Sequence, residues 1–208
     1  VTAGLDTVAV RVPAHSGAQA LLAAFDGPVA APSANPSGGI SPTQVGHVLA
    51  GLDGRIDGVL EGGACAVGVE STIVLVDDSV ALLRAGGVAV EDIEAVLGEA
   101  VARSEDPDTP KSPGQLASHY APDAVLRMDA DVARSDEVLI GFGAVESALN
   151  LSAKGDLAEA AANLFAMLRK ADALAAQTGK TIAVSPVPNV GLGLAINDRL
   201  QRAAADRS

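Results

Sequence analysis

Arginine and hydroxyl side chains stand at the predicted strand ends and sharp turns of this sequence. Arg11 lies within an otherwise apolar strand, where a guanidinium must be paired or bind an anion. Arg84 ends another strand, and Glu70-Ser71-Thr72 leads into a third. Because α/β proteins usually bind ligands at strand ends, these side chains together predict a ligand site.

The Ser33-Ala-Asn35 segment, between two prolines, could aim hydroxyl, amide and backbone N–H groups at a ligand. From spacing alone, an ordinary proline-rich turn is the favoured interpretation.

Three segments resemble generic nucleotide-binding motifs but do not match them. Gly179-Lys180-Thr181 lacks the glycine five positions earlier, and Gly191-Leu-Gly193 lacks the third glycine of a dinucleotide fingerprint. Gly141-Phe-Gly143 is likewise only a pair, so all three are interpreted as turn glycines.

The amino-acid composition argues against nucleic-acid binding and against a disulfide-stabilised fold. The 208 residues carry a net charge of -12, and aromatic residues make up 2%. Proteins bind a nucleic-acid backbone through clustered Lys and Arg side chains and stack bases on aromatic rings. An acidic chain with few aromatic residues is therefore not expected to bind nucleic acid directly. One cysteine, Cys65, excludes a disulfide framework. We expect a cytoplasmic protein without a signal peptide or a membrane span.

The first half of the chain is predicted to alternate strands and helices. Strands are expected at residues 7–12, 28–31, 58–61, 71–77 and 80–84, which are β-branched or apolar runs. Helices are expected at residues 16–25, capped by Ser16, at residues 43–52, capped by Thr43, and at residues 90–103.

Three prolines interrupt residues 104–113, which are interpreted as the start of a linker. The predicted organisation is a first domain at residues 1–103, a linker at residues 104–123 and a second α/β domain at residues 124–208. In the second domain, strands are expected at residues 137–142 and 181–187, and helices at residues 157–177 and 193–205. This alternation predicts a small parallel sheet.

The ordered set of these segments resembles the YrdC-like fold of the threonylcarbamoyl-AMP synthases. The resembling pieces are Thr7-Val-Ala-Val-Arg11-Val-Pro13, Ala31-Pro-Ser33-Ala-Asn35-Pro-Ser-Gly, Ser41-Pro-Thr43, Gly68-Val-Glu70-Ser71-Thr72-Ile-Val, Leu83-Arg84-Ala-Gly-Gly, Ser112-Pro-Gly, His119-Tyr120-Ala-Pro122 and Gly191-Leu-Gly-Leu-Ala-Ile-Asn197-Asp198-Arg199. Each piece alone is weak, but the ordered set covers nearly the whole chain and is specific. The implied fold is the carboxyl-terminal part of a YrdC-like open twisted sheet domain, a linker and a small Rossmann-like parallel α/β domain.

The resemblance also implies site residues and a reaction. Arg11, Ser33 and Ser71 would hold L-threonine, and Thr7, Asn35, Ser41, Arg84 and Tyr120 would contact ATP. The implied enzyme is a nucleotidyltransferase that condenses L-threonine, bicarbonate and ATP with Mg²⁺. It would pass its product to a separate complex that modifies tRNA. The second domain could serve as a lid, a scaffold or a docking surface.

One departure from the family concerns the start of the chain: members carry roughly a hundred residues before the equivalent of Val1, within the usual size of a domain. We therefore expect this chain alone to be inactive or unstable, with strands that lack sheet neighbours. Two alternatives are a carbamoyl-transfer domain of the hydrogenase-maturation type and a non-enzymatic RNA-binding module.

Overall fold

A parallel sheet in the second half of the chain forms the best-buried part of the structure. The computed structural model describes residue 4, residues 6–103 and residues 118–206. The sheet consists of β4 (Leu126–Arg127), β7 (Thr181–Val184), β5 (Glu137–Gly141) and β6 (Leu149–Asn150), in that order. Every neighbouring pair is parallel; Val138 of β5, for example, lies opposite Ile182 of β7. The predicted small parallel sheet is therefore confirmed.

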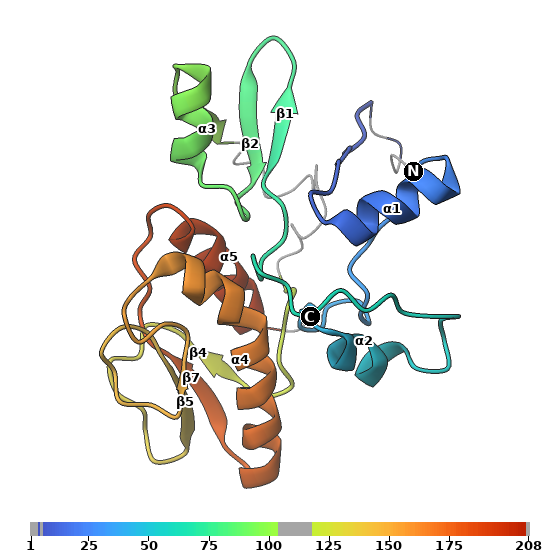
Figure 1. Ribbon diagram of the computed structural model, residues 1–208. Coiled ribbons are helices and arrows are strands. Elements are labelled where there is room, and N and C mark those ends of the chain that lie inside the picture. The colour runs from blue at the N-terminus through green and yellow to red at the C-terminus, as the bar shows by residue number, and fades with distance from the viewer. Residues whose placement is uncertain (1–3, 5, 104–117, 207–208) are drawn as a thin grey trace.

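Helix α4 (Leu157–Thr178) connects β6 to β7 and lies across the sheet (Figure 1). The Asp156 side chain caps its first turn by accepting from the backbone N–H of Glu159, at 2.8 Å. The helix ends at Gly179, whose φ of 68° is easily adopted by glycine. Its buried residues follow helical spacing: Ala160, Ala161, Leu164, Phe165, Leu168, Ala171 and Ala175.

Helix α5 (Gly193–Ala204) packs beside α4 and completes this core. The helices predicted at residues 157–177 and 193–205 are thus confirmed to within one residue at each end. Two residues from the first half of the chain, Ile40 and Val69, belong to the same core. The two halves of the described chain are therefore packed together through shared apolar contacts.

The first half contains α1 (Ser16–Phe25), α2 (Val45–Leu52), and the antiparallel pair β1 (Ile73–Val76) and β2 (Val80–Arg84). Helix α3 (Val90–Leu97) follows, and β3 (Ala102–Arg103) lies parallel to β2. Figure 1 shows the β1–β2 hairpin with α3 at one end of the molecule. Helix α2 lies beside the parallel-sheet unit, which comprises β4 to β7 with α4 and α5, and α1 lies farther from that unit on the same side. A small second core contains Leu82, Val90 and Val101.

Several predicted strands of the first half are wrong. Residues 7–12, 28–31 and 58–61 form no strand, and no other described residue pairs with them in a ladder. Val8, Val10 and Val12 are 55%, 84% and 85% exposed. Their β-branched pattern favours an extended backbone, but a strand also needs a neighbouring chain to bond its N–H and C=O groups.

Three predicted helix ends also need correction. His15, rather than Ser16, caps α1, because its Nδ1 accepts from the N–H groups of Gly17 and Ala18. Thr43 does not cap α2, which begins at Val45. The helix predicted over residues 90–103 ends at Leu97, because Gly98 adopts a φ of 76° that terminates it. The predicted linker residues 104–117 lie outside the described residues.

No helix in the described part of the chain combines the length and apolarity needed to cross a membrane.

An ion pair joins two strands of the sheet that are not neighbours. Arg127 of β4 donates from Nε and Nη2 to the two carboxylate oxygens of Glu137 on β5, at 2.7 and 2.6 Å. The backbone N–H of Arg134 donates to the same carboxylate at 2.7 Å. Hydrogen bonding to Arg127 lowers the pKa of the buried Glu137 from 4.5 to about 2.

This depressed pKa predicts acid-sensitive folding. The Glu137 contribution is fully present above pH 4.5 and is lost as the pH falls towards 2. We expect Glu137→Gln to be less stable than the unsubstituted chain at neutral pH, and this difference to shrink between pH 4.5 and 2. Urea unfolding across that window measures it, with the exposed Glu146→Gln as the control. A difference that stays constant down to pH 2 would contradict the assignment.

Candidate functional site

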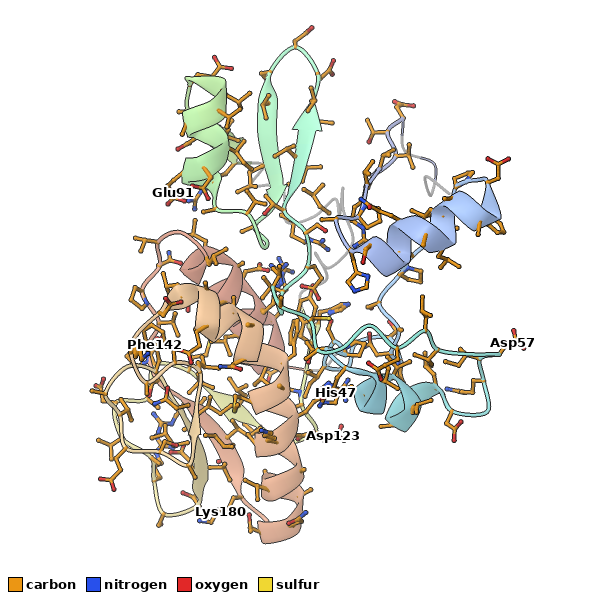
Figure 2. All side chains as sticks on the ribbon, viewed as in Figure 1. His47, Asp57, Glu91, Asp123, Phe142 and Lys180 are labelled. Carbon is orange, nitrogen blue, oxygen red and sulfur yellow. The ribbon has the colours of Figure 1, made fainter. Side chains whose placement is uncertain are left out.

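A cluster of polar side chains lies where the two halves of the chain meet. It draws Ser41 and Glu70 from the first half, Tyr120 from the segment before β4, and Arg199 from α5. His47 of α2 is labelled in Figure 2; burial lowers its pKa, and the charge of Arg169 on α4 lowers it further. We call Ser41, Glu70, Ser71, Arg84, Tyr120 and Arg199 the junction cluster.

Arg199 is the most deeply buried charged residue of the junction cluster, with 0% exposure. Its Nε donates to Glu70 Oε2 at 3.0 Å. Its Nη1 donates to the carbonyl oxygen of Ala85 and to Asp198 Oδ2, both at 2.8 Å. Nη2 is also buried but finds no partner within the described residues. Burying a guanidinium without partners costs desolvation free energy, and these hydrogen bonds offset that cost.

Glu70 connects Arg199 to Ser41. Its second oxygen, Oε1, accepts from the Ser41 hydroxyl at 2.8 Å, and Ser41 itself is 5% exposed. Arg169 of α4 reaches the backbone of the same segment, donating to the carbonyls of Ile40 and Ser41. Ser41 is therefore held both through its side chain and through its main chain.

Gly68 allows the segment before Glu70 to approach α4. Its φ is 75°, and a Cβ built on it would lie 2.2 Å from the carbonyl oxygen of Ala161. Such a contact is too short for any carbon atom, so only glycine fits between this segment and the helix.

Tyr120 closes one side of the cluster, with 2% exposure and a φ of 59°, which is unusual for a non-glycine residue. Its ring lies 4.1 Å from the His119 ring and 5.4 Å from the Phe165 ring, between centroids. The Arg199 guanidinium carbon lies 5.6 Å from the same ring centroid. Burial raises the pKa of the Tyr120 phenol, and the charge of Glu70 raises it further.

Arg84 lies at the end of β2 and donates from Nε and Nη2 to the carbonyl oxygen of Ser71, at 3.2 and 2.8 Å. Burial lowers the pKa of Arg84, and the positive charge of Arg199 lowers it further. Burial likewise lowers the pKa of His119, whose Nδ1 is buried without a partner among the described residues. The cluster therefore gathers two guanidinium groups, the Ser41 hydroxyl and the Tyr120 phenol near the Glu70 carboxylate, with the Asp198 carboxylate on the far side of Arg199. Guanidinium, hydroxyl and phenol groups are donors of the kind that bind an anionic ligand.

The structure brings together only some of the residues predicted to bind ligands. Ser41, Arg84 and Tyr120 meet in the junction cluster, with the backbone of Ser71. Asn35 is partly buried nearby: its Nδ2 donates to the carbonyls of Pro36 and Gly39, at 2.9 and 3.1 Å. Gly39 in turn pairs with Ala121, next to Tyr120.

Thr7, Arg11 and Ser33 are exposed, and no hydrogen bond or ion pair among the described residues joins their side chains to the cluster. The premise that Arg11 lies in an apolar strand is wrong, since residues 7–12 form no strand, and the binding of an anion by Arg11 stays a prediction.

Sequence reasoning placed Glu70 among the polar residues at strand ends but gave it no binding role, and it missed Arg199 as a site residue. The signal for Arg199 is its place on the buried face of α5, where Ala195, Ile196, Leu200 and Ala203 are its neighbours at helical spacing. A charged residue within such an apolar stripe needs a buried partner.

Comparisons with known proteins match the whole described architecture. A family model described as the C-terminal domain of threonylcarbamoyl-AMP synthase matches residues 88–205, and one described as telomere recombination matches residues 1–86. Threonylcarbamoyl-AMP synthases from Bacillus subtilis and Pyrococcus abyssi are 38% and 36% identical over 100% of this chain. The chain belongs to the threonylcarbamoyl-AMP synthase family.

Two solved structures carry the same fold as this family member. The crystal structure of P. abyssi Sua5 complexed with L-threonine has a TM-score of 0.84 and 36% identity, covering 98% of this chain and 65% of that one. A substituted variant of the same P. abyssi protein gives a TM-score of 0.81 at 34% identity. The predicted α/β fold class is thereby confirmed.

The chain spans 66% of the length of the B. subtilis and P. abyssi synthases that it matches. The hydrogenase-maturation and RNA-binding alternatives are not favoured by these matches.

The close approach of Gly68 to α4 predicts a position-specific stability loss. An alanine with positive φ costs about 1–2 kcal/mol. Overpacking against the α4 backbone adds roughly 1–3 kcal/mol. We expect Gly68→Ala to lower the free energy of unfolding by the sum of the two, measured by urea denaturation.

Gly98→Ala is the matched control, because Gly98 has a φ of 76° and nothing within 4 Å of a built Cβ. It should show only the first of the two costs. Equal losses for the two variants would mean that Gly68 and α4 do not pack as described.

Proposed function

We propose that the gene product containing this chain is an L-threonylcarbamoyladenylate synthase, a nucleotidyltransferase. It converts L-threonine, bicarbonate and ATP into threonylcarbamoyl-AMP, pyrophosphate and water. The observation that carries the proposal is the match over the full chain to two named synthases, supported by a related structure that contains L-threonine. The junction cluster adds groups suited to an anionic nucleotide.

In the proposed site, Thr7, Asn35, Ser41, Arg84 and Tyr120 contact ATP, and Arg11, Ser33 and Ser71 hold L-threonine. Arg84 stabilises phosphate charge, and the Ser41 hydroxyl and the Tyr120 phenol orient the nucleotide. The carbamate of threonine attacks the α-phosphorus of ATP, and pyrophosphate leaves. Because both the carbamate and the mixed anhydride are labile in water, the reaction requires a site that excludes solvent.

We propose that Mg²⁺ enters this site as a companion of ATP. Within the described ranges, no three His, Cys, Asp or Glu side chains form a metal-binding group. Mg²⁺ commonly binds through substrate phosphates with only one or two carboxylates, and there it would offset the charge of the triphosphate. Catalysis by the chain's own residues is then mainly orientation and charge stabilisation.

The product is proposed to pass to the complex that transfers the threonylcarbamoyl group to tRNA, in the cytoplasm. We propose no direct nucleic-acid contact by this chain, whose net charge is -12.

The test of the reaction is pyrophosphate release by the gene product that contains these residues, with the B. subtilis synthase as the positive control. Release that requires ATP, L-threonine and bicarbonate together is the expected result. Release that is independent of threonine, or no release under conditions where the B. subtilis synthase is active, would overturn the proposal.

The role of Arg84 gives a second prediction. Arg84→Gln should lower kcat/KM for ATP by about 100-fold, because a preorganised cation at the phosphates is lost. The exposed Arg134→Gln is the control and should leave the rate unchanged. Steady-state kinetics on variants with native circular dichroism measures both, and equal rates for Arg84→Gln and the control would exclude Arg84 from the ATP site.

A further inference from the structure

Two arginines from the second half of the chain hold the same short segment of the first half. Arg169 of α4 donates to the backbone carbonyls of Ile40 and Ser41. Arg199 of α5 donates to Glu70, whose other oxygen accepts from the Ser41 hydroxyl. The two helices thus reach Ser41 by independent routes, one through its main chain and one through its side chain.

The Glu70 route leaves little freedom to the Ser41 hydroxyl. Both carboxylate oxygens of Glu70 are engaged: Oε1 accepts from Ser41 at 2.8 Å and Oε2 from Arg199 at 3.0 Å. If Glu70 turned away, the fully buried Arg199 would lose the acceptor at its Nε and keep only the Asp198 carboxylate and the Ala85 carbonyl, both at Nη1, which is unfavourable. The direction of the Ser41 hydroxyl is therefore set by the position of α5.

The Arg169 route fixes the backbone at the same point. Burial lowers the pKa of Arg169, so the guanidinium pays a desolvation cost at this position. Its bonds to the carbonyls of Ile40 and Ser41 offset that cost. Gly68 brings the segment that leads into Glu70 against the backbone of α4, and α4 packs against α5, so both routes begin from one packed helix pair.

We propose that the parallel-sheet unit is a scaffold for the ATP side of the site, with Arg169 and Arg199 as positioning residues for Ser41. This inference rests on the proposed function, because Ser41 is placed there among the ATP contacts. Neither arginine needs to touch substrate. Since an error of about 1 Å in a contacting group can cost about 100-fold in rate, holding Ser41 from two sides has a direct catalytic consequence.

The test uses the gene product that contains this chain, with Arg199→Met and Arg169→Met compared with Lys170→Met. Lys170 is adjacent to Arg169 on α4 but exposed, so it is the matched control. We expect Kd for a non-hydrolysable ATP analogue, measured by calorimetry, to rise about tenfold for both arginine variants, the loss expected when one hydrogen bond is misaligned. Kd for L-threonine and the control should change less than about twofold.

Arg199→Met leaves the Glu70 carboxylate without its guanidinium partner. If this single variant does not fold, the double variant Glu70→Gln with Arg199→Met removes both charges and takes its place in the test. The double variant should show the same weakening of nucleotide binding. In a Ser41→Ala background, Arg199→Met should cause no further change in Kd for the ATP analogue, because the group it positions is absent.

The scaffold role would be overturned if Arg199→Met raised the Kd for the ATP analogue further in the Ser41→Ala background. It would also be overturned if the arginine variants folded and bound the nucleotide with unchanged affinity. Equal weakening of L-threonine and nucleotide binding would overturn it as well, because that would indicate a general structural effect. A gene product that binds the ATP analogue through Ser41 but releases no pyrophosphate with threonine would instead contradict the proposed function alone.

Discussion

The buried pair of Arg199 and Glu70 is the interaction on which the junction of this molecule depends. A guanidinium with 0% exposure is stable only where carboxylate and carbonyl oxygens meet it, and those oxygens come from Glu70, Ala85 and Asp198. Two of these three belong to the first half of the chain. The pair therefore fixes α5 against the segments at residues 68–71 and 84–86, and the Tyr120 ring packs beside the same guanidinium.

The second half of the fold could be predicted because its signals are local. Helix α4 has a capping aspartate, a buried face at helical spacing and a terminal glycine, and β5 and β7 are short apolar runs beside it. The strands β4 and β6 were missed, since two residues carry no readable periodicity. The strand predicted at residues 7–12 failed because alternation reports a preference for extended backbone, not the presence of a pairing partner.

The candidate site was predictable in part, and for a different reason. Arg84 was identified by its place at a strand end, and Ser41 and Tyr120 through resemblance to a family; the structure gathers all three near Glu70. Glu70 and Arg199 contact one another across 129 positions of sequence, so no local pattern could pair them. Only the charged residue within the apolar face of α5 pointed towards a buried partner. Thr7, Arg11 and Ser33 stay outside the cluster, and the assignment of these residues to ATP or L-threonine rests on the resemblance.

The central claim is that the junction cluster forms the ATP side of a threonylcarbamoyl-AMP synthase site. A crystal structure of the gene product with L-threonine and a non-hydrolysable ATP analogue tests it most directly. The account predicts nucleotide phosphates within hydrogen-bond distance of Ser41 and Arg84, with Tyr120 against the nucleotide and the bond from Arg199 to Glu70 intact. A nucleotide bound elsewhere, with Ser41 still bonded to Glu70 and far from any phosphate, would contradict it.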